Sequence, residues 1–417
     1  MKVLWVSAGI FDDADEKQSG VWQKALVVKL AEVPGHEFGN VSYQSFSSAI
    51  VYNVYKNIKQ WGIPRQGRIR NGMPPKKVCS QFLKIVDDFD PDIIQVWGSE
   101  NPFKLLPFRT GKKAIRVLTM QGVLGSISSH ILRGLSVQEI LSAIGIREIL
   151  TNISLLSIRR FFQKEAKVEQ RMLNSADFIL TQSEWTESQI TPLINGIGCF
   201  RVRRVLRNPF LQCDKWTMFT HPNPIVYSAS WGYSLKATHI LIKAISIVKE
   251  TVPDVELRIA GATGRRDWLM NGYLRLILRM IRRLGLESNV KWLGAIDATT
   301  IVKHLQEASV FVNTSFVESY SLVLAEAMSV GTPCVVSYAG AMPELADPGK
   351  EALFFSPGDY KQCAHQILKL LKNSQLAHNI STNAIQRSNK RENGLDYIKA
   401  HFDTYEAILR HKSRDQS

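Results

Sequence analysis

Short apolar, β-rich runs alternate along this chain with longer stretches in which apolar residues recur every three to four positions. In the first half, strands are predicted over residues 3–9, 91–98, 114–122 and 176–183. Helices are predicted over residues 21–32 and, from repeated apolar spacing, across residues 136–174. This alternation indicates parallel βαβ units, because two parallel strands need a crossover connection that is usually a helix.

The alternation starts again after residues 221–224, where two prolines indicate a linker. Strands are predicted over residues 224–230, 255–261, 289–295, 308–315 and 332–337, and helices over 238–250 and 321–329. The sequence therefore predicts an α/β protein with two doubly wound, Rossmann-like parallel-sheet domains, residues 1–220 and 221–385. We expect the polar helical segment 386–417 to pack back on the first domain. Ligands of such sheets bind at the carboxyl ends of the strands, so a cleft between the domains is the expected site.

Charge narrows the choice of ligands. The 417 residues include 52 Lys and Arg against 37 Asp and Glu, which gives a net charge of +15 and a pI near 9.6. An excess of this size favours polyanions, namely nucleic acid, an anionic membrane surface or phosphorylated substrates. Apolar residues make up 45% of the chain and charged residues 21%, which is typical of a globular protein and excludes a disordered chain or a fibre.

The cysteines and histidines indicate neither a disulfide framework nor a metal site. The five cysteines are an odd number without a CxxC pair, and the nine histidines form no HxH or HExxH motif. A reducing compartment is expected. Residues 1–10 are apolar, but acidic residues follow where a signal peptide would need a cleavage site, so a buried first strand is the better interpretation. No run of about 18 apolar residues occurs, so we expect any membrane contact to be peripheral.

The most informative segment is Asn313–Leu345. A predicted strand ends near Thr314, and a polar loop then leads to a helix that ends at Gly331. The loop places Ser319, Tyr320 and Ser321 at the helix N-terminus, where backbone N–H groups and the helix dipole favour a phosphate. Glu318 precedes the helix and Glu326 lies inside it. Carboxylates beside an anion site are useful for a ligand that also carries ribose or sugar hydroxyls.

This segment resembles the retaining GT-B glycosyltransferases, specifically family 4. Their donor motif, E-x7-E followed by E-A-(small)-x-G-x-P-V-V and a G-G-x-P-E-like turn, is matched by Glu318, Glu326, Ala327, Gly331, Pro333 and Gly340–Glu344. The resemblance continues through LRIAG (257–261) and FFSPGD (354–359) over nearly the whole C-terminal half. It implies the GT-B fold, metal-independent transfer, no cofactor, and a nucleotide sugar as substrate.

The resemblance also implies roles for individual residues. Glu326 would bind the nucleotide ribose, and Glu318 would hold the donor sugar near its reacting carbon. The backbone of Ser319–Ser321 would bind the diphosphate. Lys236 matches the lysine of the family's K-G-x-x-x-L motif, which neutralises the leaving diphosphate. A surface lysine at a helix start is the alternative explanation for Lys236.

Several positions depart from the family pattern. Trp231 stands where the family has an arginine, about five residues before Lys236, and Arg265 or Arg266 could supply the missing cation. Gly20 matches a Gly-rich loop that reaches the diphosphate, although an ordinary loop glycine fits nearly as well. Gln121 replaces a common histidine on the acceptor side. His130 is a second acceptor-side candidate, with a plain surface histidine as the alternative.

Basic side chains alternate with bulky apolar ones in LLSIRRFFQK (155–164), which is the better candidate for contact with an anionic membrane. The amphipathic stretch 273–283 is interpreted as packing against the sheet. Nucleic acid is not expected as a partner, because no nucleic-acid module is recognisable.

Together these features predict a retaining hexosyltransferase that moves a sugar from a UDP- or GDP-sugar to a saccharide or lipid-linked acceptor. Surface polysaccharide synthesis, at the cytoplasmic face of a bacterial membrane, is the expected context. The alternative is a catalytically weakened GT-B fold that acts as a membrane-associated binding protein. A nucleotide-sugar epimerase is a third possibility, against which the E-x7-E register argues.

Overall fold

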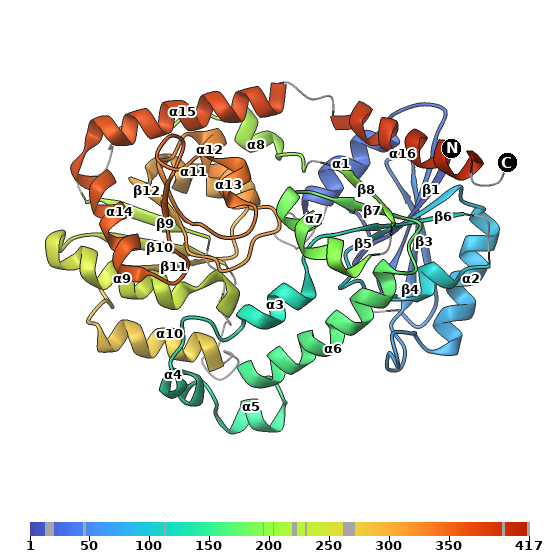
Figure 1. Cartoon of the computed structure of the whole chain (residues 1–417), viewed down its shortest axis with the longest axis horizontal. Helices are drawn as coiled ribbons and strands as arrows, with labels where there is room; N and C mark the ends of the chain where they lie inside the picture. The colour runs from blue at the N-terminus through green and yellow to red at the C-terminus, as the bar shows by residue number, and fades with distance from the viewer. Residues whose placement is uncertain are drawn as a thin grey trace. The chain divides into compact units, whose positions relative to one another are not determined.

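The computed structural model describes residues 1–12, 21–44, 47–111, 114–194, 196–202, 204–218, 223–229, 232–261, 272–393 and 397–414. The chain divides into two compact units, each with its own sheet (Figure 1). The first unit comprises residues 1–125, 163–205 and 395–417, and the second comprises residues 126–162 and 206–394. Of the first domain expected over residues 1–220, residues 126–162 and 206–220 group with the second unit.

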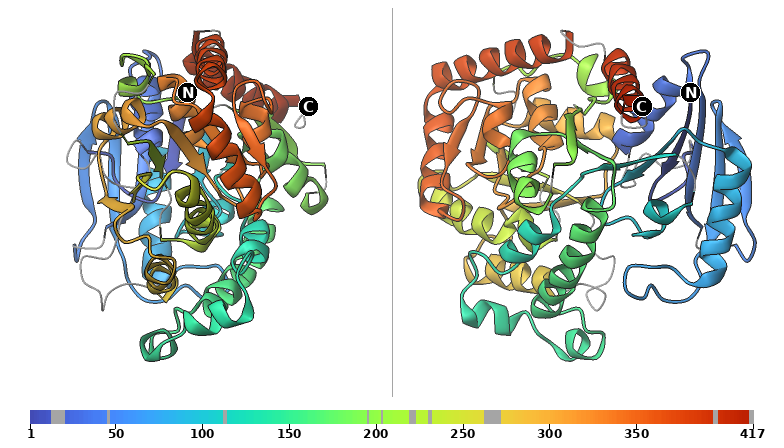
Figure 2. Two further views of the ribbon diagram at one scale, coloured as in Figure 1. Left: turned by 90° about the vertical axis from the view of Figure 1, so that its left-hand side faces the viewer. Right: turned by 45° about the vertical axis from the view of Figure 1, so that its right-hand side comes forward.

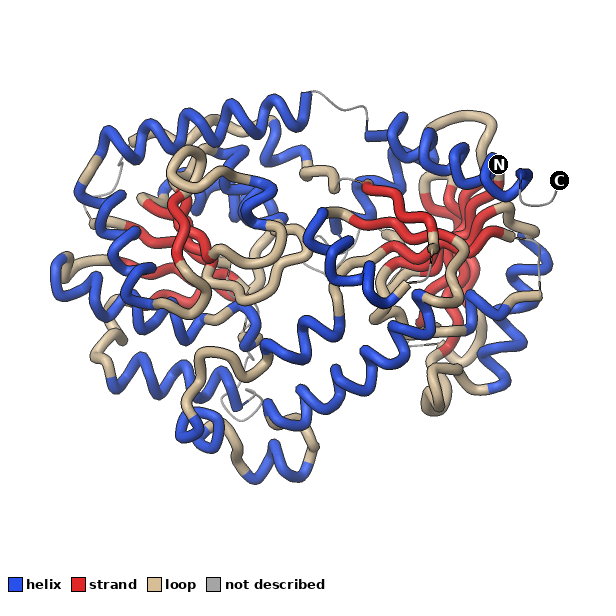
Figure 3. The backbone as a smooth tube through the Cα atoms, viewed as in Figure 1, coloured by secondary structure: helices blue, strands red, loops and turns tan. Residues whose placement is uncertain are grey.

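The first unit is built on an eight-stranded sheet (Figure 3). Its strands lie in the order β3 (Val51–Tyr55), β4 (Ile58–Pro64), β2 (Glu37–Gln44), β1 (Lys2–Val6), β5 (Ile93–Trp97), β6 (Ile115–Thr119), β7 (Phe178–Thr181) and β8 (Gly198–Arg201). Neighbouring strands are parallel except for the antiparallel pair β3 and β4. Side chains of β1 alternate between two cores, with Leu4 and Val6 on one face and Val3 and Trp5 on the other. Both faces of this sheet are therefore buried, as in other parallel sheets.

Helices of the first unit are α1 (Val21–Ala31), α2 (Lys76–Phe89), η1 (Leu106–Arg109), α7 (Glu184–Ile190), η2 (Thr191–Leu193) and α16 (Tyr397–Arg414). The C-terminal helix α16 is tied to the sheet by a buried polar contact. Tyr405 in α16 donates its hydroxyl to Gln95 Oε1 in β5 at 2.5 Å, and Trp5 Nε1 donates to the same oxygen at 3.2 Å. The last helix thus belongs to the unit that also contains the N-terminus.

The second unit contains a six-stranded, all-parallel sheet. Its strands lie in the order β11 (Val290–Gly294), β10 (Glu256–Ala260), β9 (Ile225–Ser228), β12 (Val310–Asn313), β13 (Cys334–Ser337) and β14 (Leu353–Phe355). The first strand, β9, lies between β10 and β12, so the strand order reverses direction there. Loops diverge at the carboxyl ends of strands at such a switch point, which is where open α/β sheets bind ligands.

Helices of the second unit are α3 (Leu124–His130), α4 (Val137–Ser142), α5 (Ile146–Leu150), α8 (Asn208–Leu211), η3 (Ser234–Lys236), α9 (Thr238–Thr251), α10 (Gly272–Arg283), α11 (Ala298–Glu307), α12 (Leu322–Val330), α13 (Met342–Leu345), α14 (Tyr360–Lys372) and α15 (Ser374–Asn393). Helix α6 (Leu155–Leu173) crosses the division between the units, and α3 begins just before it. None of the described helices combines the length and the apolar character needed to cross a lipid bilayer.

The helical character predicted across residues 136–174 is confirmed, and it takes the form of three helices, α4, α5 and α6, with breaks between them. Hydrogen bonds at the helix starts accompany the breaks. Ser136 and Glu139 form a capping box at the start of α4, and at the start of α5 the Glu148 carboxylate accepts from Gly145 N at 2.9 Å. These contacts satisfy backbone N–H groups where a new helix begins.

Candidate functional site

The candidate site lies at the carboxyl ends of β9 and β12, the switch point of the second sheet. The η3 turn after β9 carries Lys236, and the loop after β12 carries Glu318. The two segments are held together by hydrogen bonds to the backbone carbonyls of η3, since the Thr314 side-chain Oγ1 donates to the Lys236 carbonyl at 2.8 Å and Phe316 N donates to the Leu235 carbonyl at 2.9 Å. These two contacts fix the η3 turn against the loop that carries Glu318.

Lys236 and Glu318 form a direct ion pair, with 2.6 Å between Nζ and Oε1. Ser315 Oγ donates to the same carboxylate oxygen at 2.8 Å. The Glu318 side chain is 9% exposed, whereas that of Lys236 is 33% exposed. The carboxylate is thus fixed from inside the protein, while the ammonium group stays accessible to a ligand.

A tight turn after β13 supports the backbone of Glu318. Ala341 N donates to the Glu318 carbonyl at 2.8 Å. Gly340 adopts φ +57°, and a Cβ at this position would lie 2.0 Å from the Glu318 carbonyl oxygen. Only glycine fits such an approach. The glycine of the matched G-G-x-P-E-like turn therefore serves the placement of Glu318.

Glu326 is buried inside α12 and is paired with Arg207, at the start of α8. Arg207 donates to Glu326 Oε1 from Nη2 at 2.7 Å and from Nε at 3.2 Å. The guanidinium also lies over the Phe210 ring, 4.8 Å from its centroid. Burial raises the pKa of Glu326, and the positive charge of Arg207 opposes that rise. Arg207 therefore favours the ionised form of a carboxyl group that burial alone would neutralise.

The N-terminus of α12 is organised by polar side chains. Asn313 Nδ2 donates to Ser321 Oγ at 3.0 Å, and Ser321 Oγ accepts from Leu324 N at 3.4 Å as the N-cap. Ser319 is half-buried and precedes the buried Tyr320. The three predicted phosphate-binding positions thus stand at the positive end of a helix that follows Glu318 directly.

The structure brings some of the residues predicted from the sequence into contact, but not all of them. It brings Lys236 and Glu318 into contact, and it gives Glu326 a different cation, Arg207. The sequence alone does not identify Arg207 as a site residue. Arg207 and Glu326 are 119 positions apart in the chain, so no local motif indicates their pairing, and the one available signal is an arginine beside the Asn208–Pro209 helix start.

Other candidates lie outside this constellation or outside the described residues. Gln121 is half-buried in the first unit, two residues after β6. His130 ends α3, and its Nδ1 hydrogen-bonds with the Ser126 carbonyl at 2.7 Å. The positions of Gly20, Trp231 and Arg265 fall outside the described residues, so their expected roles remain predictions.

Among the residues that the structure describes, no group of three or more His, Cys, Asp or Glu side chains is arranged to hold a metal ion. The chemistry available at the site comes from a partly exposed ammonium group, a helix N-terminus and two buried carboxylates. Such a set binds an anion and accepts hydrogen bonds from hydroxyl groups on the same ligand.

The fold and this site define a protein with two Rossmann-like α/β units and a charged site at the switch point of the second sheet, which is the GT-B architecture. Residues 215–387, which contain Lys236, Glu318 and Glu326, match the family described as Glycosyl transferases group 1.

The chain is also similar to known proteins. The chain is similar to the glycogen synthase of Mycobacterium tuberculosis, with 27% identity over 225 residues, which are 53% of this chain and 51% of that protein. The chain thus spans about half the length of this curated relative. Sucrose-phosphate synthase from Thermosynechococcus elongatus has a similar structure, with a TM-score of 0.73 and 15% identity over 98% of this chain and 99% of that one. The Anabaena protein HepE, in complex with UDP and glucose, gives a TM-score of 0.69 and 16% identity over the same shares.

Proposed function

We propose that the protein is a glycosyltransferase that takes a sugar from a nucleotide-sugar donor. The observation that carries this proposal is the Lys236–Glu318 ion pair at the switch point, inside the segment that matches the glycosyl transferases group 1 family. A cation and a carboxylate in contact suit a donor that presents a diphosphate beside a sugar ring. We further propose family 4 and its E-x7-E motif as the finer assignment, with transfer that retains the anomeric configuration.

Each residue has a role in the proposed reaction. Lys236 neutralises the charge that develops on the leaving diphosphate, so that transfer proceeds without a bound metal. The helix N-terminus at Ser319–Ser321 binds the phosphates, and Glu318 holds the donor sugar. Glu326 accepts hydrogen bonds from the ribose hydroxyls, and the positive charge of Arg207 favours its ionised form. Positioning and electrostatics carry the catalysis.

The donor is proposed to be a UDP- or GDP-sugar. Support for uridine comes from the structural neighbours, since HepE was solved with UDP and with UDP-glucose, and trehalose-6-phosphate synthase of E. coli with UDP-2-fluoro glucose. The acceptor is proposed to be a saccharide or a lipid-linked saccharide, bound with the help of Gln121 and His130. The net charge of +15 supports a context at the inner face of an anionic bacterial membrane, in surface polysaccharide synthesis.

A second candidate function is a membrane-associated binding protein without transferase activity. Trp231, in place of the arginine expected from the family resemblance, favours it. The two candidates differ in one observable: only the transferase releases a nucleoside diphosphate from a nucleotide sugar. Binding of vesicles in the absence of any turnover would support the second candidate.

The proposal is tested by thermal unfolding of the protein with UDP, GDP, ADP and CMP. A nucleotide at 100 times its dissociation constant stabilises the folded state by about 2.7 kcal/mol, which is a readily measured shift. We expect one nucleoside diphosphate to stabilise the wild type and not Glu326→Ala. Lys303→Ala, a change of an exposed lysine on α11, is the control that should respond like the wild type. Equal responses of the wild type and Glu326→Ala would contradict the proposed site.

A further inference from the structure

Exposed apolar side chains gather in one part of the second unit. Among the described residues, half of the twelve large hydrophobic side chains that are exposed lie between residues 137 and 161. They are Val137, Leu141, Ile146, Ile149, Leu150 and Phe161, here called the exposed apolar cluster. Ile146, Ile149 and Leu150 are 78%, 69% and 80% exposed. A contiguous group of this kind on a folded protein indicates an interaction surface.

The cluster lies on α4, α5 and the start of α6, which project from the second unit (Figure 2). The helices are held there by specific contacts. Arg279 in α10 donates to the carbonyl of Ser142, and Arg275 in α10 forms an ion pair with Glu148. Gly272 at the start of α10 approaches Ala143 so closely that a Cβ would lie 1.8 Å from its carbonyl oxygen. The helices that carry the exposed apolar cluster are thus held in place by contacts with α10.

The acidic residues of this segment are turned inward. Residues 126–162 contain only two, Glu139 and Glu148. Glu139 pairs with Lys243 at 2.9 Å, and its side chain is 12% exposed. Glu148 is fully buried and accepts from Gly145 N at 2.9 Å as well as pairing with Arg275. Neither carboxylate places a negative charge on the outer surface next to the cluster.

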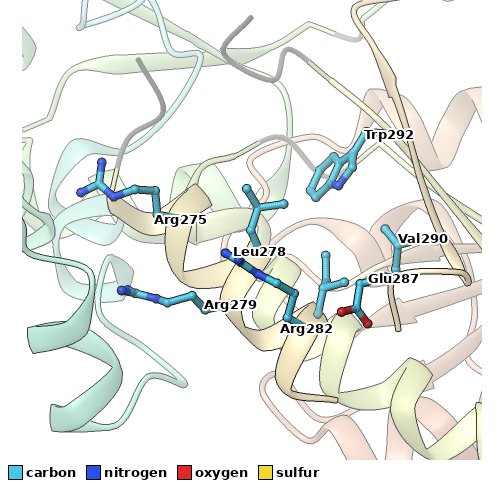
Figure 4. Close-up of a pocket in the computed structure, with 8 residues that line it drawn as sticks. Arg275, Leu278, Arg279, Arg282, Glu287, Val290 and Trp292 are labelled. Atoms are coloured by element: carbon cyan, nitrogen blue, oxygen red, sulfur yellow. The ribbon is translucent and has the colours of Figure 1, made fainter. Parts of the chain in front are cut away.

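Basic side chains flank the cluster. Arg159 and Arg160 are exposed on α6, and Arg282 and Arg283 are exposed at the end of α10. These four form no ion pair with any residue that the structure describes. Arg282 also lines a cavity of about 580 Å³ together with Arg275, Arg279 and Trp292 (Figure 4). The surface therefore combines exposed apolar groups, exposed cations and a cavity bordered by three guanidinium groups and one carboxylate, that of Glu287.

We propose that this surface, formed by α4, α5, the start of α6 and α10, docks on an anionic phospholipid membrane. Apolar side chains then enter the headgroup region while arginines meet the phosphates, as in interfacial helices. Charge complementarity favours lipid over a second copy of the chain, because two such surfaces would bring their arginines together. The inference specifies the membrane partner named in the proposed function, and its test needs no nucleotide sugar, so either can fail alone.

Co-sedimentation with vesicles tests the inference. The wild type should bind vesicles of equal parts phosphatidylglycerol and phosphatidylcholine, and should bind at least tenfold less in 0.5 M salt or to phosphatidylcholine alone. The combined variant Ile146→Gln, Ile149→Gln, Leu150→Gln should lose at least tenfold in affinity with an unchanged unfolding temperature, because these side chains are exposed. Replacing Arg282 or Arg283 by Gln should each reduce binding about fivefold.

The matched control replaces exposed apolar residues elsewhere, Val54→Gln with Ile69→Gln in the first unit, and should bind like the wild type. Equal binding by the triple variant and the wild type would overturn the inference, as would equal binding to neutral and anionic vesicles. A wild type that self-associates independently of salt, with a triple variant that stays monomeric, would show that a second copy is the occupant and would likewise overturn it.

Discussion

Removing the guanidinium of Arg207 tests the interpretation of Glu326 as a buried carboxylate that depends on one cation. Arg207→Ala deletes both hydrogen bonds to Glu326 Oε1, at 2.7 Å and 3.2 Å. Glu326 would then be a carboxyl group that is 5% exposed, without its cation. Its pKa, already raised by burial, should rise further.

The magnitude follows from burial. Removing one partner of a buried ion pair typically costs about 3 to 5 kcal/mol. Two features reduce this cost. The Arg207 side chain is 18% exposed, and Glu326 can lose its unpaired negative charge by taking up a proton. We therefore expect Arg207→Ala to lower the free energy of unfolding by about 2 to 3 kcal/mol at pH 8. Nucleotide affinity should fall with it, because a protonated carboxyl is a weaker acceptor for ribose hydroxyls.

The pH dependence has a definite sign. The folded-state pKa of Glu326 is above its ordinary value of 4.5, and it is higher still in the variant. Within that window the folded protein binds the proton more tightly than the unfolded chain, so stability decreases as pH rises. Because this window extends to higher pH in the variant, the loss caused by Arg207→Ala should be largest at pH 8 and should diminish toward pH 5.

Urea unfolding at pH 5 and pH 8 measures both effects. The matched control is Arg201→Ala, which removes an arginine from an exposed pair with Glu187. A surface pair of that kind contributes about 0 to 1 kcal/mol, so the control should change stability little at either pH. A cost for Arg207→Ala no greater than for Arg201→Ala, or a cost that does not change with pH, would refute the reasoning.

Three further substitutions have definite outcomes. Gly340→Ala should lower the free energy of unfolding, measured in urea, by at least about 2 kcal/mol and should weaken nucleotide binding, because the new Cβ would collide with the Glu318 carbonyl. A variant as stable as the wild type would contradict the turn geometry. Ala237→Gly should change stability by less than about 1 kcal/mol, since relief of φ +51° offsets the lost buried methyl; a loss above 2 kcal/mol would refute this. Glu169, 1% exposed, has a pKa that burial raises to about 7, so wild-type stability should fall by about 3 kcal/mol as pH rises from 4.5 to 7. Glu169→Gln should abolish that fall, and an unchanged pH profile would count against it.

Apolar runs in the sequence predicted nine of the described strands, whereas β2, β3, β4, β8 and β14 were missed. Runs such as residues 91–98 contain β5, and the strand predicted over 308–315 contains β12. Strands β2 and β4 were not predicted, because they bury polar side chains. Asn40 and Gln60 are fully buried and satisfy each other, with Asn40 Nδ2 donating to Gln60 Oε1 at 3.2 Å. In the sequence alone, buried polar residues of this kind look like loop residues, because their hydrogen-bond partners are not apparent.

The same limit applies to the site. Lys236 and Glu318 follow adjacent strands of one parallel sheet, so the order of the strands is enough to place them near one another. Arg207 reaches Glu326 from a segment that precedes the first strand of the unit, and no periodicity or motif encodes that approach. The sequence therefore predicts which side chains meet when they follow adjacent strands of one sheet. It does not predict contacts made by a segment that lies far away in the sequence and outside the sheet.

The central claim is that Lys236 and Glu318 act on the diphosphate and sugar of a nucleotide-sugar donor. The most direct measurement is release of free nucleoside diphosphate from a panel of UDP- and GDP-sugars by the wild type, by Lys236→Met and by the control Lys303→Met. We expect release from one class of donor by the wild type and the control, and a loss of at least a hundredfold in Lys236→Met. Equal release by all three proteins, or no release from any donor by a folded wild type that still binds the nucleotide, would contradict it.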